Sequence, residues 1–330
     1  MAILATEKVP TLDYWKPAHK LQVGDYVFDK DGNVVRVTLV QEYRARACYE
    51  VTLDDHLTIS GDEHLAFALE TPKYRNRLST YKGVQKFRRP LKRMAVSELL
   101  DLPLVNKNNR KCYSVPTVKA LQYPHQDLPV PPFVFGYWFY AYRASKNFWT
   151  TSPNTEMILE KFHNHGYLVT KHKLQDNGRQ VFSCKPRVES HLQGNLPNKI
   201  PNNYLFSSEE QRIELLSGIM CAKIAQYKPK DDEFQFSSKN FGEVTRIQGL
   251  VESLGSRTRI FFASSISCYT LYFKTHIKLV ANQASPPVKV HKARRYVKQI
   301  TQIAPQSCVH VETSGVDNTI LVGEGFISTC

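Results

Sequence analysis

The sequence predicts a mixed fold in which an all-β domain is divided between the two ends of the chain and encloses an α/β domain. Three observations predict it. Residues 1 to about 68 are β-rich, and β character returns from Arg294 onward. The proline-rich stretch Leu128–Pro132 ends the first region, and a helix-and-strand plan that occurs twice follows it. An uninterrupted β pattern at both ends favours one split domain with an insertion.

Composition sets the broad class of protein. At 330 residues the chain is long enough for two ordinary domains, and its 42% hydrophobic content supports packed cores. Its formal net charge of +14 suits a polyanionic partner, of which nucleic acid is the commonest. The alternative is a basic surface that binds nothing, and composition alone does not separate the two.

The cysteines and apolar runs predict an intracellular protein. Seven cysteines form no CxxC pair, which argues against a disulfide framework or a structural metal site and favours a reducing, cytoplasmic compartment. The N-terminus lacks the apolar core of a signal peptide. The most apolar run, Phe133–Tyr142, is about half the length of a membrane span, so we expect no membrane association.

The first β region contains a hairpin signal. Strand-like DYVF and VVRVTLV flank the turn Asp29–Asn33, and Val51–Thr58 is a further strand with a local turn. Residues 69 to 110 are basic and irregular, with one short helix at Ala95–Leu100. That stretch is either a solvated loop or an insertion that faces DNA.

The middle region predicts three helices. Thr155–Gly166 and Lys239–Gly255 both end at a glycine, which suits a helix C-terminus. Ser207–Ile224 begins with Ser-Ser-Glu-Glu, which combines a cap with early negative charge. The segments that begin near Pro131 and Pro201 each continue into an apolar helix with a glycine, so we expect an internal duplication.

The two β regions resemble the halves of a hedgehog/intein splicing domain. The resemblance rests on Gly24-Asp25, Val27 and Asp31-Gly32 near the start and on SCVHVETSGVDNTILVGEGFISTC at the end. In motif style the chain is similar to inteins of phage large terminases or replicative helicases. The family implies an all-β horseshoe. We expect an N-terminal splicing segment with a basic insertion at 1–118, an inserted domain at 119–285 and a C-terminal splicing segment at 286–330.

The resemblance implies an autocatalytic site that needs no cofactor. The family's first nucleophile, which attacks the preceding peptide carbonyl, falls on Ala2, and alanine has no nucleophile. Either the chain belongs to the minority class that starts with alanine, or a cysteine or serine has been replaced. The histidine that polarises the scissile amide falls on His64. The family's threonine three residues earlier falls on Gly61. Ser60 and Asp62 are secondary candidates.

The C-terminal part of the site falls on the last strands. Cys308 occupies the place of an acid or thiol, and His310, two residues on, is a secondary candidate on the same strand face. Cys330 stands at the C-terminal junction, where the family's His-Asn pair is missing. It occupies either the histidine position of that pair or the position of the nucleophile that follows it. We therefore expect a splicing-blocked form of a monomeric element whose partners are the flanking exteins of a host protein. A hedgehog-like autoprocessing domain is a rival that the inserted domain argues against.

The middle region resembles a double-motif LAGLIDADG homing endonuclease, an αββαββα fold. The resemblance rests on LPVPPFVFGYWFYAYRASKNFWTTS, IPNNYLFSSEEQRIELLSGIMCAKIA and QGLVESLG. The family's two metal-binding carboxylates, which hold Mg²⁺, fall on Ala141 and Lys223, and neither residue can bind a metal. We therefore expect an inactive nuclease without bound Mg²⁺.

The two motif helices of this family touch through small residues. Here Gly136, Ser217, Gly218 and Ala222 keep that character. Tyr140 and Tyr142 replace small residues, so we expect a respaced or locally distorted helix pair.

DNA binding is separable from cutting. From the resemblance we expect weak binding of double-stranded DNA through Lys171, Lys173, Arg257 and Arg259. The alternative is that these residues form an ordinary solvated surface. A DNA-binding protein, or a residual endonuclease or nickase, is the competing function.

Overall fold

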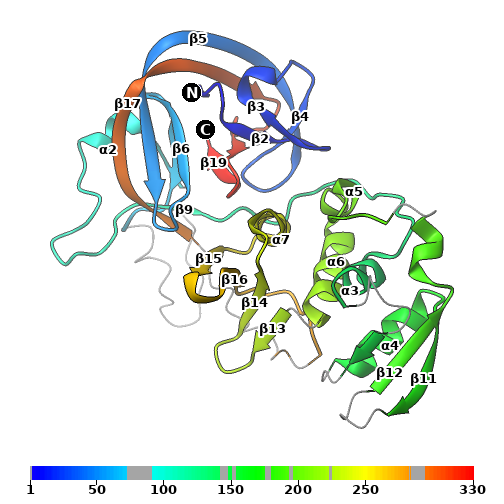
Figure 1. Cartoon of the computed structure of the whole chain (residues 1–330). Helices are drawn as coiled ribbons and strands as arrows, with labels where there is room; N and C mark the ends of the chain where they lie inside the picture. Colours follow the sequence, from blue (N-terminus) through cyan, green and yellow to red (C-terminus); the bar gives the residue numbers. More distant parts are fainter. Residues whose placement is uncertain are drawn as a thin grey trace, which may run out of the picture. The chain divides into compact units, whose positions relative to one another are not determined.

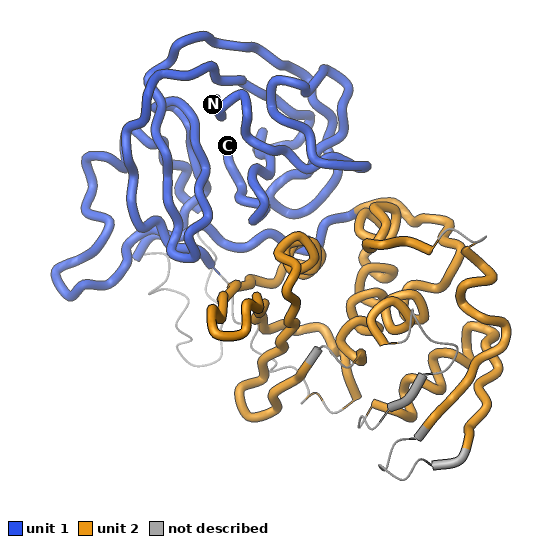
Figure 2. Tube along the Cα trace, viewed as in Figure 1, with its two compact units in different colours: residues 1–122, 291–330 blue, residues 123–290 orange. Residues whose placement is uncertain are grey.

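The chain forms two compact units in a computed structural model, which describes residues 2–72, 91–141, 148–150, 154–174, 180–192, 196–222, 225–281, 283 and 294–330. Unit 1 contains residues 1–122 and 291–330, and unit 2 contains residues 123–290 (Figure 2). Both ends of the chain therefore belong to the same unit, and unit 2 is a continuous stretch between them.

Two 20-residue strands form the frame of unit 1. β5 (Val34–Leu53) and β17 (Arg294–Thr313) pair antiparallel from Val297 opposite Leu53 to Thr313 opposite Val37, and both curve strongly in Figure 1. They belong to a sheet of order β4-β5-β6-β1-β17-β9, in which β5 also pairs with β17. Its other strands are β1 (Ala2–Leu4), β4 (Tyr26–Phe28), β6 (Thr58–Asp62) and β9 (Ser114–Pro116).

A second sheet of unit 1 has the order β18-β19-β7-β8. Its strands are β18 (Ile320–Val322), β19 (Ile327–Thr329), β7 (Ala66–Leu69) and β8 (Lys92–Ala95). The remaining elements are β2 (Lys8–Pro10), β3 (Trp15–Pro17), η1 (Ala18–Lys20) and α2 (Val96–Leu100). The predicted hairpin is confirmed, because Phe28 pairs with Val34 across the Asp29–Asn33 turn. The segment predicted as irregular contains strand β8 directly before the predicted helix.

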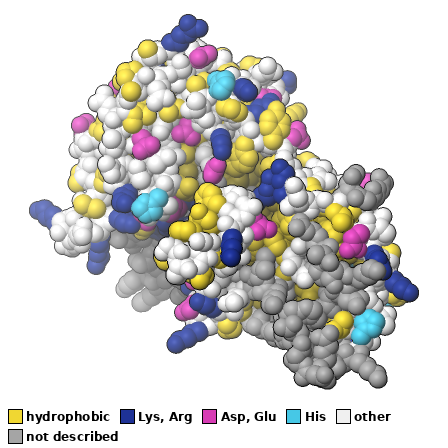
Figure 3. Space-filling model, viewed as in Figure 1, with side chains coloured by type: hydrophobic (Ala, Val, Ile, Leu, Met, Phe, Trp, Pro, Cys, Tyr) yellow, Lys and Arg dark blue, Asp and Glu magenta, His cyan; other side chains and the backbone are white. Residues whose placement is uncertain are grey.

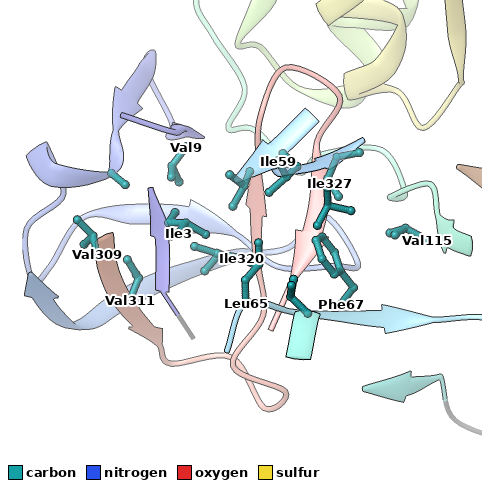
Figure 4. Close-up of a cluster of buried hydrophobic side chains, with 14 of the residues drawn as sticks. Ile3, Val9, Ile59, Leu65, Phe67, Val115, Val309, Val311, Ile320 and Ile327 are labelled. Atoms are coloured by element: carbon teal, nitrogen blue, oxygen red, sulfur yellow. The ribbon is translucent and has the colours of Figure 1, made fainter. Parts of the chain in front are cut away.

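Alternation along the strands builds the core of unit 1. Ile3 of β1 lies opposite Val309 of β17, and both are buried in the main hydrophobic cluster with Val311 and Phe67 (Figure 4). Their sequence neighbours point to the other face of the sheet, because successive strand side chains alternate. Ala2, Leu4 and Cys308 are therefore separated from the main core and form a small cluster of their own.

Unit 2 contains two sheets with helices. One sheet has the order β10-β12-β11 and the other has the order β13-β14-β16-β15. In both sheets, the strand before a helix pairs with the second of the two strands that follow the helix, as β10 pairs with β12 and β14 pairs with β16. In chain order the elements are α3 (Pro132–Ala141), β10 (Phe148–Thr150), α4 (Thr155–Asn164), β11 (Leu168–Leu174), β12 (Gln180–Lys185), η2 (Val188–Leu192), α5 (Asn202–Leu205), α6 (Glu209–Cys221), β13 (Ala225–Lys228), β14 (Glu233–Ser238), α7 (Phe241–Ser253), β15 (Thr258–Ala263), η3 (Ser264–Ile266) and β16 (Cys268–Phe273).

The three predicted helices of the middle region are confirmed as α4, α6 and α7. Ser208 caps α6 by accepting a hydrogen bond from the Gln211 N–H. Gly166 and Gly255, just past the ends of α4 and α7, have φ of +81° and +82°, which favours glycine. Among the described residues, no helix is long and apolar enough to span a membrane.

The expectation of a respaced helix pair is wrong where α3 and α6 cross. A Cβ on Gly136 would lie 2.5 Å from the Leu215 carbonyl oxygen, and one on Gly218 would lie 2.2 Å from the Phe133 carbonyl oxygen. The backbones therefore remain in the close contact that glycine permits. Tyr140 does not separate them, because its ring packs edge-on against Phe236 of β14, with centroids 5.3 Å apart. Tyr142 lies outside the described residues.

Candidate functional site

Ala2 lies in a strand held on both sides. On one side it is opposite His310 of β17, and on the other side the next residue, Ile3, is opposite Gly61 of β6. Ala2 is buried, with 2% of its surface exposed. The position that the sequence assigns to the first nucleophile is thus fixed between two chain segments that are far apart in sequence.

Cys308 of β17 lies opposite Leu4 and packs in the same cluster as Ala2. Ala2, Leu4, Cys48 and Cys308 form one buried cluster, with Tyr43 partly buried against it. The Sγ atoms of Cys48 and Cys308 lie 3.5 Å apart. The structure therefore brings together two of the predicted site positions and adds a second thiol.

A bend in the β5–β17 ribbon creates this thiol contact. In the strand register Cys48 pairs with Ile303, while Cys308 pairs with Tyr43. On a straight ribbon these two levels would be roughly 16 Å apart, since each residue advances a strand by about 3.3 Å. The ribbon bends because Ala45 has φ of +48° and because the register of β17 shifts on both sides of Gln306.

The Cys308 thiol is neutral at physiological pH. Its pKa is raised to about 12, first by burial and then by the hydrogen bond with Cys48 and the negative charge of Asp62. The guanidinium of Arg46, which lies 3.8 Å from Asp62 Oδ2, acts in the opposite direction. A neutral thiol can donate a proton or a hydrogen bond, but it is a poor nucleophile. Cys308 is therefore suited to an acid role.

Gly61 packs directly on the Ala2 backbone. A Cβ at position 61 would lie 2.4 Å from the Ala2 carbonyl oxygen, so the family's threonine does not fit here without a shift of β1. The neighbouring Ser60 is buried, and its N–H donates to Glu7 Oε1 at 2.7 Å. Burial raises the pKa of the Glu7 carboxyl, and the charge of Glu50 raises it further, while the Ser60 hydrogen bond lowers it.

His64 lies three residues beyond this contact, in the turn between β6 and β7. Its backbone N–H donates to Asp62 Oδ1 at 3.1 Å. Its side chain is 62% exposed, and its Nε2 lies 3.6 Å from Glu63 Oε1. The predicted polarising histidine is thus close to the cluster along the chain, but its imidazole lies outside the buried group.

The C-terminal segment folds as a hairpin within unit 1. The sequence GEGFI forms its turn, in which the Phe326 N–H donates to the Gly323 carbonyl and the Gly323 N–H donates to the Lys8 carbonyl. Cys330 is buried, and its N–H donates to the Ala66 carbonyl at 2.9 Å. Burial raises the pKa of its thiol. His310 is partly exposed, and its Nε2 lies 3.1 Å from Glu312 Oε1.

The structure describes one of the two predicted endonuclease positions. Ala141 is the last residue of α3 and offers only a methyl group, whereas Lys223 lies outside the described residues. Cys221 ends α6, and burial raises the pKa of its thiol to about 12, so it stays protonated. In the part of the chain that the structure describes, no group of His, Cys, Asp or Glu side chains could hold a metal ion.

Of the predicted DNA-contacting residues, Lys171, Lys173 and Arg259 lie in the two sheets of unit 2, and Arg257 directly precedes β15. Lys171 of β11 is exposed, and Lys173 lies in the same strand, with its side chain outside the described part. Arg259 of β15 is 68% exposed and pairs with Glu233 at 2.8 Å, over the Tyr272 ring. Arg257 is partly buried. On the face shown in Figure 3, the Lys and Arg side chains are scattered among neutral residues.

Sequence reasoning missed Cys48 and Glu7 as site residues. Cys48 is separated from Cys308 by 260 positions, and no local motif connects the two. Glu7 follows β1 in a short connection, where a charged residue ordinarily indicates solvent exposure. Covariation between positions 48 and 308 in related sequences would be the signal for the first, since covarying pairs are in spatial contact.

Comparisons with known proteins give the following relatives. No protein-family model matches the chain. The replicative DNA helicase DnaB of Mycobacterium intracellulare is 27% identical over 344 residues, which cover 96% of this chain and 55% of the helicase. The chain thus spans about half the length of the curated relative that it matches.

Similar solved structures include two inteins and one endonuclease. The MchDnaB-1 intein is 26% identical over 21% of this chain and 53% of that one, with a TM-score of 0.20. The gp41-1 intein is 21% identical over 34% and 73%, with a TM-score of 0.23. I-DmoI in complex with its target DNA is 11% identical over 44% and 89%, with a TM-score of 0.31. The proteins that this chain resembles are therefore a DnaB helicase, inteins and a homing endonuclease.

Proposed function

We propose that the chain is an intein, a protein self-splicing element, which carries an inserted homing-endonuclease domain of LAGLIDADG type. Unit 1 is the splicing part, with junction positions at Ala2 and Cys330, and unit 2 is the insertion. The flanking partners are the two exteins of a host protein, and the similarity to a DnaB helicase favours a replicative helicase as host. The element acts as a monomer and needs no cofactor.

One observation carries this proposal: Ala2 and Cys308 lie together in a buried cluster of unit 1, beside β6 and its continuation to His64. Splicing requires an N-terminal junction in contact with an acid and a polarising histidine. A strand held between β6 and β17 supplies a fixed junction, and the neutral Cys308 thiol supplies a proton donor. The exposed His64 side chain would turn toward the Ala2 amide once an extein precedes it.

We propose further that this form is blocked at its first step. That step exchanges the amide at residue 2 for an ester or thioester, and it needs a hydroxyl or thiol on residue 2. Ala2 supplies a methyl group. The later step at the Cys330 junction would then have no branched intermediate to resolve.

The endonuclease domain keeps its scaffold and lacks its metal ligands. Gly136 and Gly218 hold the helix pair in close contact, while Ala141 offers no oxygen to a divalent ion. Lys223 would place a cation where the second carboxylate is needed. The residues present therefore do not suit a Mg²⁺ site, and we propose that unit 2 does not cut DNA.

A repaired protein tests the splicing proposal. Ala2→Cys, with Cys330 replaced by His-Asn-Cys and a test protein fused at each end, is expected to give the ligated product on gels and by mass spectrometry. Addition of a small thiol should release the N-terminal test protein by cleaving the thioester. The same fusion that retains Ala2 is the matched control and is expected to stay unprocessed at that junction.

Two further variants of the repaired fusion assign the roles. His64→Ala should abolish thioester formation, whereas Cys308→Ala should slow it without changing the mass of the products. An inert Ala2→Cys fusion, combined with an intact fold by circular dichroism, would contradict the proposal.

A second function, weak double-stranded DNA binding, is favoured by the exposed Lys171 and Arg259 on the two sheets of unit 2. Filter binding at low salt should show retention that falls steeply as salt rises. Absence of retention at low salt would contradict it. Incubation with supercoiled plasmid and Mg²⁺ should leave the plasmid uncut, and the appearance of nicked circles would contradict the inactive assignment.

A further inference from the structure

Cys48 has no role in the proposed splicing steps, yet it occupies the centre of the buried cluster. It has no exposed surface, and neither does Cys308. Their Sγ atoms are in contact at 3.5 Å. Such a contact between two thiols, in a chain whose composition favours no disulfide framework, requires a separate explanation.

We propose that Cys48 and Cys308 are a redox-sensitive thiol pair, which hydrogen peroxide converts into a disulfide across the inner side of the β5–β17 bend. The shortest contact of Cys48 Sγ is with the Arg46 carbonyl oxygen at 3.1 Å, and both sulfurs lie near a second carbonyl. Cys48 Sγ lies 3.8 Å from the Gln306 carbonyl oxygen, and Cys308 Sγ lies 4.0 Å from it. A disulfide bond is about 2.05 Å long, so closure needs an approach of roughly 1.5 Å.

The bend makes this approach feasible. Cys48 lies three residues from Ala45, whose φ is +48°, and the register shifts of β17 lie between Ile303 and Cys308. Irregular strand segments absorb small movements more readily than a regular ladder does. A slight tightening of the bend would therefore close the sulfur–sulfur distance without breaking the β1–β17 pairing.

The chemistry balances with one peroxide molecule. The thiolate of one cysteine attacks a peroxide oxygen, which forms a sulfenic acid and releases water once the leaving hydroxide takes up the thiol proton. The second thiol then attacks the sulfenic sulfur, and its proton leaves with the hydroxyl group as a second water. Two thiols are oxidised to one disulfide, and one peroxide is reduced to two waters.

The surroundings of the two thiols make them react later than Cys268. Asp62 of β6 opposes thiolate formation at Cys308, whereas Arg46 of β5 favours it, with Tyr43 packed beneath its guanidinium at 4.2 Å. Because both thiols are buried, they react more slowly than Cys268, the cysteine that is not buried. The reaction of Cys268 therefore serves as an internal reference for exposure to the oxidant.

Closure would have two consequences. The disulfide would connect the two chain segments of unit 1 and enclose 260 positions, which constrains the unfolded state strongly. On the proposed function, it would also remove the Cys308 proton donor from the junction at Ala2. The element would then be active in a reduced state and inactive in an oxidised one.

Peptide mapping of the full chain tests the pair without any assumption about splicing. The protein is treated with hydrogen peroxide for several times the period that consumes the Cys268 thiol, and it is then alkylated and digested. We expect a peptide that links Cys48 to Cys308, with the mass of two hydrogens lost, and its disappearance after reduction. We also expect the unfolding midpoint of unit 1 to rise by about 5 °C or more.

Variants separate the pair from general oxidation. Cys48→Ala and Cys308→Ala should each abolish the linked peptide and the rise in midpoint, and Cys112→Ser, a buried cysteine of the same unit, should leave both unchanged. Free Cys48 and Cys308 at the end of this prolonged treatment, or a bridge between other cysteines, would overturn the proposal. Because this measurement uses the chain as it is, failure of the repaired fusion to splice would not affect its result.

Discussion

Units 1 and 2 each contain a close contact between a glycine and a backbone carbonyl, but different side chains lie beside the two contacts. Each brings a glycine against a neighbouring carbonyl: Gly61 on Ala2 in unit 1, and Gly218 on Phe133 in unit 2. In unit 1, two thiols and the Asp62 carboxylate lie near that contact. In unit 2, the described end of the helix pair offers the methyl group of Ala141 and the protonated thiol of Cys221. The two contacts therefore share their close packing and differ in the groups that lie beside them.

The largest expected effect is in the helix pair of unit 2. Gly218→Ala adds a methyl group 2.2 Å from the Phe133 oxygen and 2.9 Å from the Tyr137 nitrogen, and neither backbone atom can move aside easily. We expect a loss of about 3 kcal/mol in the free energy of unfolding of unit 2, measured by urea denaturation. Gly249→Ala is the matched control, since nothing lies within 4 Å of its added Cβ. It should stabilise α7 by about 0.5–1 kcal/mol. Equal effects of the two substitutions would contradict the close crossing.

Arg212 provides a second test of unit 2. It is fully buried, and it donates to the Ser207 carbonyl at 2.9 Å and to the Ser253 carbonyl at 2.8 Å. Arg212→Met fills similar space but leaves these acceptors without their donor, so unit 2 should lose about 2–3 kcal/mol of unfolding free energy. Arg246→Met removes a less buried arginine of α7 and should cost under about 1 kcal/mol. An unchanged urea midpoint for Arg212→Met would argue against a structural role for the buried guanidinium.

Gly61 tests whether unit 1 tolerates the same kind of change better. Gly61→Ala places a methyl group 2.4 Å from the Ala2 oxygen, but β1 is only three residues long and can shift. We expect a loss of about 1–2 kcal/mol from unit 1, with faster amide hydrogen exchange in β1. If Gly61→Ala lowered the unfolding free energy of unit 1 more than Gly218→Ala lowers that of unit 2, unit 1 would be the less tolerant of the two.

The smallest expected effect is a pH dependence at Glu7. Because burial raises the pKa of the Glu7 carboxyl above its ordinary value, folding favours the protonated form. The stabilising contribution is present below that value and is lost as pH rises through the higher folded-state pKa. Glu7→Gln should therefore stabilise unit 1 by up to about 1 kcal/mol at pH 7, with no gain at pH 3. Urea denaturation at both pH values measures this, and Glu42→Gln, on an exposed residue, should show no such difference.

Local features were predictable from the sequence. The Asp29–Asn33 turn, the Ser208 cap and the glycines after α4 and α7 act over a few residues, and the structure has each where the sequence indicates it. Strand β8, within the segment predicted as irregular, was not predicted, because Lys92 and Arg93 give it no apolar alternation. Its strand forms by pairing with β7. The close helix crossing was also not predicted, because the sequence does not show that the Tyr140 ring packs on Phe236 and not between the two helices.

The sequence by itself determined where the chain turns, caps and repeats, and which residue types stand at Ala2, His64, Cys308 and Ala141. Those properties depend on side-chain identity and on neighbours a few positions away. Only the tertiary structure decided that Cys48 meets Cys308, that Gly61 rests on the Ala2 carbonyl and that the His64 side chain is exposed. Cys48 meets Cys308 because the β5–β17 ribbon bends and brings together two residues that strand register places at different levels. Gly61 rests on Ala2 because β1 pairs with β6, with Ile3 opposite Gly61.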